Sequence, residues 1–230
     1  METQTDLTAS NTTSDQPMRG LLTAPALAGI AYTLAWIVGL ATWPANLDVA
    51  ASGAQVLAAY TGHQGQAMLQ YFLVEGVAAV ALASVVLALG RAARRRGAVR
   101  LGRVSLAFGF GAANLSLVQC ALGLVLAGHL VPSGDAGQAA FVFALISRLD
   151  GVKMFGLAAL AVAGVGLALR VGVLPRWLGF TGILLAVALL VSGVGYLLLN
   201  TTLALAAAVS LALLLVWVTG AGISLARASR

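Results

Sequence analysis

Six apolar runs separated by polar connections are the feature that most constrains this chain. Each run is at least about 19 residues long, enough to cross ~30 Å of hydrocarbon at 1.5 Å per residue. A backbone amide in lipid must find its hydrogen bond within the protein, and the short alternating segments of a β-barrel are absent. The sequence therefore predicts an all-α integral membrane bundle of six transmembrane helices. The spans are expected at about 21–42, 67–90, 103–130, 152–170, 177–199 and 202–226.

The composition excludes an ordinary soluble domain. Hydrophobic residues make up 60% of the chain and charged residues only 9%, too few to cover a soluble surface. The net charge of +6 resides between the apolar runs, which indicates membrane topology and argues against nucleic-acid binding. A single cysteine, Cys120, excludes an internal disulfide and any multi-cysteine metal site.

Three segments make up the expected domain organisation. Residues 1–19 are polar and lack an apolar stripe, which predicts a disordered cytoplasmic tail. Acidic residues precede the first apolar run where a signal peptide would carry basic ones, so we expect that run to stay as a span. Residues 20–226 form the transmembrane domain, and residues 227–230 form a cytoplasmic end.

The basic residues predict the orientation of the bundle. Eleven of the 13 fall on one side of a six-span chain, and only Arg148 and Lys153 fall on the other. Positive residues stay in the cytoplasm, so both termini are predicted to be cytoplasmic, in a bacterial inner membrane. The residues expected to fix this topology at the membrane surface are Arg94, Arg95, Arg96, Arg176 and Trp177.

The lipid bilayer is the first expected partner. The arginine-rich loop after the second span would also attract anionic lipid head groups, although topology alone explains its charge. A small-residue face with Ala204, Ala208 and Ala212 would serve either packing within the chain or contact with a second copy. A membrane protein partner is the other alternative, and no nucleic acid is expected.

Glu75 stands inside the second apolar run, where an unpaired carboxylate costs several kcal/mol. Counting from the arginines at 1.5 Å per residue places Glu75 about 24 Å above Arg91. The residues that fall at the same depth on the other spans are Gln119, Lys153, Ser192 and Ser210. We therefore expect a buried polar layer in which Glu75 faces the bundle interior, with Gln119 and Lys153 as its leading partners.

Two alternatives remain open for this layer. A local pair of Asp150 with Lys153, three residues apart on one helix, competes with the Glu75 pairing. Glu75 would act either as an interhelical clamp that fixes the packing or as a carboxylate that handles protons or substrate. Rotation of each helix decides between the pairings, and the sequence does not give it.

A second polar set is expected on the external side, comprising Asp150, Arg148, His63 and His129. The histidines lack the spacing of a metal-binding motif, so no metal is predicted. No nucleophile elbow, phosphate-binding loop or haem motif occurs either, so no catalytic residue and no cofactor are predicted. Two external segments, 51–60 and 136–149, are expected to be helical, the latter lying on the outer surface or leading into the fourth span.

The second half of the chain carries a pattern of motifs. Leu149 and Asp150 precede the fourth span, Lys153 lies at its start, and a Leu-Pro-Arg-Trp-Leu-Gly turn follows at 174–179. With this pattern the chain resembles the bacterial membrane family named domain of unknown function 4386. The resemblance implies a multi-span architecture over about residues 20–226. It implies no activity, because that family brings none.

Three function classes follow. The first expectation is a non-enzymatic membrane component that senses a signal or supports a partner. The first alternative is a small proton-coupled transporter that uses the Glu75 and Lys153 layer, and the second is a membrane-embedded enzyme. Water access separates them, since a carrier needs a path to Glu75, a scaffold seals it, and an enzyme needs a pocket with converging catalytic groups.

Overall fold

The computed structural model describes residues 24–43 and 47–228, and its regular structure over these ranges is helical throughout. Six of its helices are long and apolar enough to cross a membrane. This confirms the prediction of an all-α, multi-pass membrane bundle for the described part of the chain. The tail predicted for residues 1–19 and the last two residues of the predicted cytoplasmic end lie outside the described residues.

Several of the six spans are composed of more than one helical element. The first span is α2 (Ala24–Thr42), and the short α3 (Gly53–Tyr60) follows it. The second span consists of α4 (Gln64–Tyr71), the π-helical turn η1 (Phe72–Val77) and α5 (Ala78–Arg95). The third consists of α6 (Val99–Val125), the π-helical turn η2 (Leu126–Leu130) and α7 (Val131–Ser133). The last three are α8 (Ala136–Leu169), α9 (Arg176–Leu198), and α10 (Thr201–Ala204) with α11 (Ala206–Ala228).

The fourth span differs most from its predicted bounds. It was expected at 152–170, but α8 begins at Ala136 and runs for 34 residues, about 51 Å at 1.5 Å per residue. The chain contains no proline between its N-cap Asp135, whose side chain accepts a hydrogen bond from the Gln138 backbone N–H, and the end of α8. Of the two alternatives for 136–149, the structure therefore has the helix that leads into the span. The expected short helix at 51–60 is α3.

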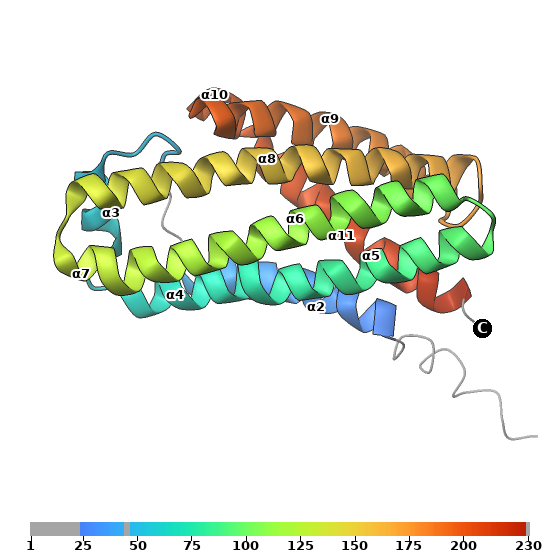
Figure 1. Cartoon of the computed structure of the whole chain (residues 1–230), viewed down its shortest axis with the longest axis horizontal. Coiled ribbons are helices and arrows are strands. Elements are labelled where there is room, and N and C mark those ends of the chain that lie inside the picture. The colour runs from blue at the N-terminus through green and yellow to red at the C-terminus, as the bar shows by residue number, and fades with distance from the viewer. Residues whose placement is uncertain (1–23, 44–46, 229–230) are drawn as a thin grey trace, which may run out of the picture.

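The six spans form a closed ring in chain order. α2 packs against α5, α5 against α6, α6 against α8, α8 against α9, and α9 against α11, which returns to α2. The α5–α6 turn, the α8–α9 turn and the end of α11 lie together at one end of the bundle (Figure 1). We call this the arginine end, and the opposite end, where α3, α7 and α10 lie, the α3 end.

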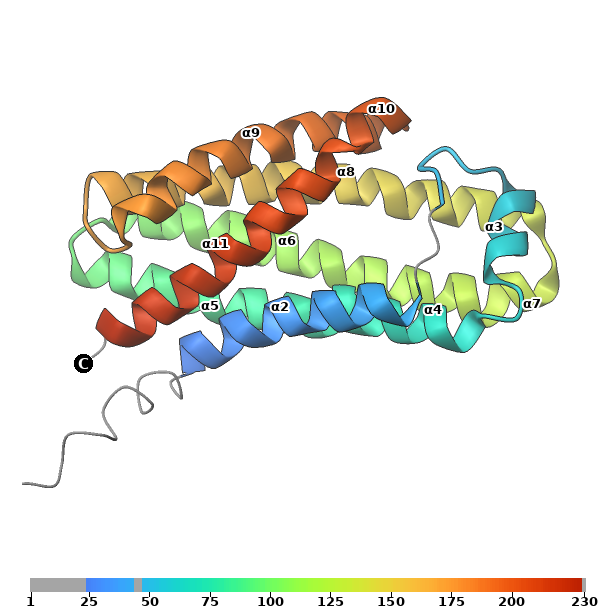
Figure 2. The ribbon, with the colours of Figure 1, turned by 180° about the vertical axis from the view of Figure 1, so that it is seen from behind.

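The contact between α2 and α11 that closes the ring lies in its arginine-end half. The hydroxyl oxygens of Thr33 and Thr219 are 2.7 Å apart, and Thr219 also donates to the backbone oxygen of Gly29. Gly222 packs on the backbone of Pro25 farther along. From this contact the two helices diverge toward the α3 end (Figure 2).

Two apolar clusters fill the bundle. The larger one lies within the spans and includes Leu82, Leu157 and Trp217. The smaller one lies at the α3 end, where the rings of Trp43 and Tyr60 meet edge to face with centroids 4.5 Å apart. The polar layer sits at the boundary between the two clusters.

Asp48 ties the connection after α2 to α10. The Thr201 hydroxyl lies 2.7 Å from each Asp48 carboxylate oxygen, and the Ala50 backbone N–H donates to one of them at 2.9 Å. The Ala50 N–H first, and then the Thr201 hydroxyl, hold the pKa of Asp48 below its usual value. A lowered pKa in the folded state contributes stability that is present above the unfolded-state pKa and is lost as the pH falls through the folded-state pKa.

Asp48→Asn is therefore expected to lower the thermal midpoint slightly at pH 7. The difference from the wild-type protein should begin to shrink as the pH falls below about 4 and vanish below the lowered folded-state pKa of Asp48, because both proteins then carry a neutral side chain there. Thermal unfolding of both proteins in detergent, from pH 7 to below about pH 4, measures the difference between their thermal midpoints. A difference that stays constant with pH would show that the carboxylate charge contributes nothing to this contact.

Candidate functional site

A buried ion cluster joins the second and fourth spans. The Lys153 ammonium donates to both carboxylate oxygens of Glu75, at 2.9 and 2.8 Å, and forms a 2.7 Å ion pair with Oδ1 of Asp150. The side chains of Glu75 and Lys153 are each only 7% exposed. An ammonium carries three N–H donors, so these three contacts use all of them.

The local backbone explains how Glu75 reaches this position. It lies in the π-helical turn η1, whose wider winding locally shifts the helix register, and both Val74 and Glu75 are buried there. α2 comes close to this turn at Gly39, where any Cβ would meet Val74. On α8, Asp150 and Lys153 are three residues apart and so project from one face of the helix.

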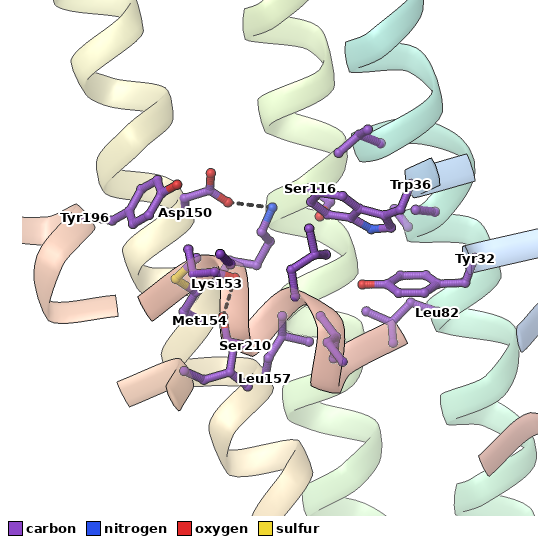
Figure 3. Close-up of a pocket in the computed structure, with 18 of the residues that line it drawn as sticks. Tyr32, Trp36, Leu82, Ser116, Asp150, Lys153, Met154, Leu157, Tyr196 and Ser210 are labelled. Atoms are coloured by element: carbon purple, nitrogen blue, oxygen red, sulfur yellow. Dashed lines mark hydrogen bonds and ion pairs between the residues drawn. The ribbon is translucent and has the colours of Figure 1, made fainter. Parts of the chain in front are cut away.

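A central cavity of about 230 Å³ lies beside the cluster. Residues of all six spans line it, and most of them are apolar. Its polar lining consists of Tyr32, Trp36, Ser116, Asp150, Lys153, Tyr196 and Ser210. Figure 3 shows the Lys153 ammonium between Asp150 and Tyr196 on one side and Trp36 and Tyr32 on the other. Apolar walls with a few converging polar groups are typical of small-molecule sites.

A second cavity, of about 170 Å³, lies on the other side of the cluster. Glu75 lines this one, together with Trp43, Tyr60, Gln70 and Tyr71. The hydroxyl oxygens of Tyr60 and Tyr71 are 2.9 Å apart. Burial raises the pKa of Tyr60, which lies outside the spans, to about 12, so its hydroxyl keeps its proton at physiological pH. The ion cluster thus separates two cavities, with Glu75 facing one and Asp150 and Lys153 facing the other.

The structure brings only part of the predicted polar layer together. Lys153 meets Glu75, and the local pair with Asp150 forms at the same time, so the two predicted pairings coexist. The expected pairing of Gln119 with Glu75 is wrong. Its amide donates instead to the backbone oxygen of Ile146 at 3.1 Å, because the rotation of α6 turns this side chain toward α8.

The two serines of the layer have different positions. The buried Ser192 hydroxyl donates to the backbone oxygens of Ala188 and Leu189 in its own helix, so it does not join the ion cluster. Ser210 lines the central cavity, with its hydroxyl on the backbone oxygen of Ala207. Short hydroxyl side chains reach their own helix backbone before they reach another helix.

The expected external polar cluster does not form. Asp150 turns inward to Lys153, while Arg148 is exposed and makes no salt bridge with a described residue. His63 pairs with Gln66, and His129 is exposed on η2. Over residues 24–43 and 47–228, no group of three or more His, Cys, Asp or Glu side chains could hold a metal ion.

The predicted topology residues gather at the arginine end. Arg94 and Arg95 occupy the last turn of α5, Arg96 follows it, and Arg176 begins α9. Trp177 is 48% exposed, as expected for an indole at the membrane surface.

Three aromatic residues of the central cavity were missed from the sequence. Tyr32, Trp36 and Tyr196 all lie within apolar spans, where an aromatic ring reads as ordinary packing. The polar atom on each ring could have marked them as site residues, since a buried hydroxyl or indole N–H usually requires a hydrogen-bond partner. The Trp36 Nε1 atom is buried and has no hydrogen-bond partner in the described structure.

No protein-family model matches this chain, and neither a curated protein nor a solved structure matches it. The resemblance to domain of unknown function 4386 therefore stays a prediction. The functional argument rests on the ion cluster and its two cavities.

Proposed function

We propose that this protein is a proton-coupled carrier in which Glu75, Asp150 and Lys153 hold an exchangeable proton beside a central substrate cavity. The observation that supports it most is the composition of the cluster. Two carboxylates share one ammonium, so the fully ionised cluster has a surplus of one negative charge at the wall of a cavity. A surplus charge in an apolar interior is costly, and binding a proton or a cation removes that cost.

The neighbouring titratable groups do not cancel this charge. The groups that face the cluster are Tyr32 from α2, Tyr71 from α4, Cys120 from α6 and Tyr196 from α9. All four are neutral when protonated, and each could only add negative charge by ionising. The compensating positive charge therefore has to come from outside the described bundle.

The cavity on the Glu75 side gives the proton a route. It reaches from the α3 end to Glu75 past the Tyr60 and Tyr71 hydroxyl pair. Two hydroxyl groups in hydrogen-bond contact can pass a proton, because each is both a donor and an acceptor. In the proposed cycle a proton arrives by this route, and substrate occupies the central cavity on the far side of the cluster.

The sensing or partner-supporting component is the competing function. It would be favoured by a sealed cluster, whereas Asp150, Lys153 and Glu75 all line cavities. An enzyme would call for a nucleophile or metal group converging on the cavity, and the cavity lining offers two serines that are not set beside a histidine. These observations favour the carrier.

We further propose that the arginine end faces the cytoplasm of a bacterial inner membrane. Support comes from the charge distribution, with eleven of the 13 basic residues on that side of the chain. The cluster then lies in the outer half of the membrane, and the cavity that Glu75 lines is nearest the external surface. Anionic lipid head groups are the expected contacts of the exposed Arg94, Arg95 and Arg96.

Infrared difference spectroscopy of the protein in lipid tests whether the ion cluster binds an exchangeable proton. We expect a carboxyl C=O band that grows and fades between about pH 5 and 8, the range of a proton-handling group near its operating pH. Its amplitude should correspond to one proton per chain. Glu75→Gln and Asp150→Asn identify the carboxyl, and Arg148→Gln, an exposed position on the same helix as Lys153, is the matched control.

A cluster that keeps one protonation state throughout this range would contradict the carrier. Combined with a loss of thermal stability in Glu75→Gln, that result would make the cluster a structural clamp. The competing sensing or partner-supporting function would then be favoured.

A further inference from the structure

We propose that the central cavity binds the head group of an amphiphilic organic cation, which reaches it from the membrane and exchanges with the proton of the cluster. This inference rests on the proposed carrier function and names its class of substrate. It is carried by three features of the cavity: its charge, its aromatic lining and the place where it meets the lipid.

The charge presented to the cavity is negative. Lys153 directs its three donors to Glu75 and Asp150, so it has none left for an anionic ligand. Asp150 uses Oδ1 for this pair, and its Oδ2 makes no hydrogen bond or ion pair with a described residue. The Asp150 side chain is 23% exposed, against 7% for its partner Lys153. The accessible charged atom of the cavity is therefore a carboxylate oxygen.

Three aromatic residues line the cavity that this oxygen reaches, one beside Asp150 and two beyond the Lys153 ammonium. Tyr196 lies beside Asp150, and Trp36 and Tyr32 lie across the cavity from it (Figure 3). The faces of such rings attract ammonium groups, by about 0.5–2 kcal/mol each and most strongly when the site is desolvated. A carboxylate with aromatic walls is the combination that recognises an organic ammonium ion. An amine or quaternary ammonium ligand fits, and a phosphate or carboxylate ligand does not.

The cavity reaches the lipid-facing side of the bundle where α2 and α11 diverge. These helices touch at Thr33 and Thr219 in the arginine-end half, and they spread toward the α3 end (Figure 2). In the spread half the cavity is lined by Leu40 of α2 and by Ala208 of α11, both exposed apolar residues within the spans. A ligand that arrives here comes from the bilayer and carries an apolar body.

The volume of the central cavity determines which part of the ligand enters it. About 230 Å³ is less than the ~300–1,000 Å³ of sites that enclose a drug-sized ligand. The cavity therefore holds the ammonium head with its nearest groups, and the apolar remainder lies between α2 and α11. Because the cation and the proton neutralise the same surplus charge, binding of one favours release of the other.

Calorimetry on the full chain in an uncharged maltoside detergent tests the inference, with benzyltrimethylammonium as the probe. Neopentylbenzene, its neutral isostere, and phenylacetate, an anion, are the comparison ligands. We expect the cation to bind at least about tenfold more tightly than the isostere, equivalent to about 1.4 kcal/mol, and the anion not to bind. Binding enthalpies in two buffers of different ionisation enthalpy should reveal proton release.

The variants locate the site. Asp150→Asn and Trp36→Leu are each expected to weaken binding of the cation about tenfold or more, while the exposed Arg148→Gln leaves it unchanged. Trp36→Leu keeps the test decisive if Asp150→Asn does not fold. Competition by phosphatidylethanolamine, with phosphatidylglycerol as control, would identify a lipid head group as the source of the ammonium. Failure of that lipid to compete would identify a free amphiphile.

Equal binding of the cation and its isostere, or no binding of the cation, would overturn the inference. So would an affinity that both Asp150→Asn and Trp36→Leu leave unchanged. If the infrared carboxyl band of the cluster still titrates between about pH 5 and 8 in that case, the carrier proposal stands and only the substrate class fails. If the band does not titrate, the carrier proposal itself fails, and with it the exchange.

Discussion

Lys153→Met is expected to lower the free energy of unfolding by about 3–5 kcal/mol, the cost of leaving a buried charge without its partner. The ammonium is the sole cation within reach of both Glu75 and Asp150 among the described residues. Its removal leaves two carboxylates facing each other across an apolar interior. Methionine has nearly the length of lysine, so the change removes the charge with little loss of packing. Unfolding in mixed micelles of maltoside and dodecyl sulfate, followed by tryptophan fluorescence, measures the change.

The double variant Glu75→Gln with Lys153→Met separates the charge effect from a packing effect. Removing both members of a buried ion pair costs less than removing one, so the double variant should recover part of the loss, with the 23% exposed Asp150 carboxylate still lacking its cation. Arg148→Gln controls for the removal of a positive charge at an exposed position on the same helix. A Lys153→Met protein as stable as the wild type would show that the cluster is not held together by this ammonium.

Gly151→Ala is expected to cost about 1–3 kcal/mol, the usual penalty of overpacking a tight contact. Gly151 is buried in α8 where that helix crosses α9. A Cβ at this position would lie 2.7 Å from Cγ of Leu197 and 2.8 Å from the backbone oxygen of Gly193. The backbone oxygen has no rotamer by which to move away, so α8 and α9 would have to separate. Asp150 and Lys153 flank this position, so the ion cluster would shift too.

Gly111→Ala is the matched control for that prediction. Gly111 lies in the interior of α6, and a Cβ there would meet nothing within 4 Å. The same substitution should therefore stabilise the protein by up to about 1 kcal/mol, because alanine favours the helix. Thermal midpoints of the two variants in the same detergent are expected to move in opposite directions. Equal shifts of the two thermal midpoints would show that α8 and α9 can separate at Gly151 without a loss of stability.

The depth of the polar residues was predictable because a helix rises by a fixed 1.5 Å per residue. Counting from the arginines placed Glu75 and Lys153 at one height, although 78 positions separate them along the chain. Their ion pair at 2.8 Å agrees with that count. The same count placed Gln119 in the layer, and its amide nevertheless reaches a backbone oxygen of α8. Height follows from the sequence, and facing direction does not.

The predicted start of the fourth span was the reason that Asp150 was placed with the external residues. At the predicted start of the fourth span, 152, it stood at the membrane surface. In the structure α8 is already helical from Ala136, so Asp150 lies well inside a continuous helix and turns toward Lys153. The π-helical turn at Phe72–Val77 was not predictable either, since no residue pattern marks it, and it helps to set the inward position of Glu75.

The sequence by itself determined that the chain is a six-helix membrane bundle, because length and apolarity are properties of each segment alone. It also determined the charge asymmetry between the two ends and the height of the buried ions. The tertiary structure alone decided which helices adjoin, how each is rotated, and that α2 and α11 meet in one half and part in the other. These features depend on close contacts between residues far apart in the chain, such as Thr33 with Thr219. Only those contacts create the two cavities and place the ion cluster between them.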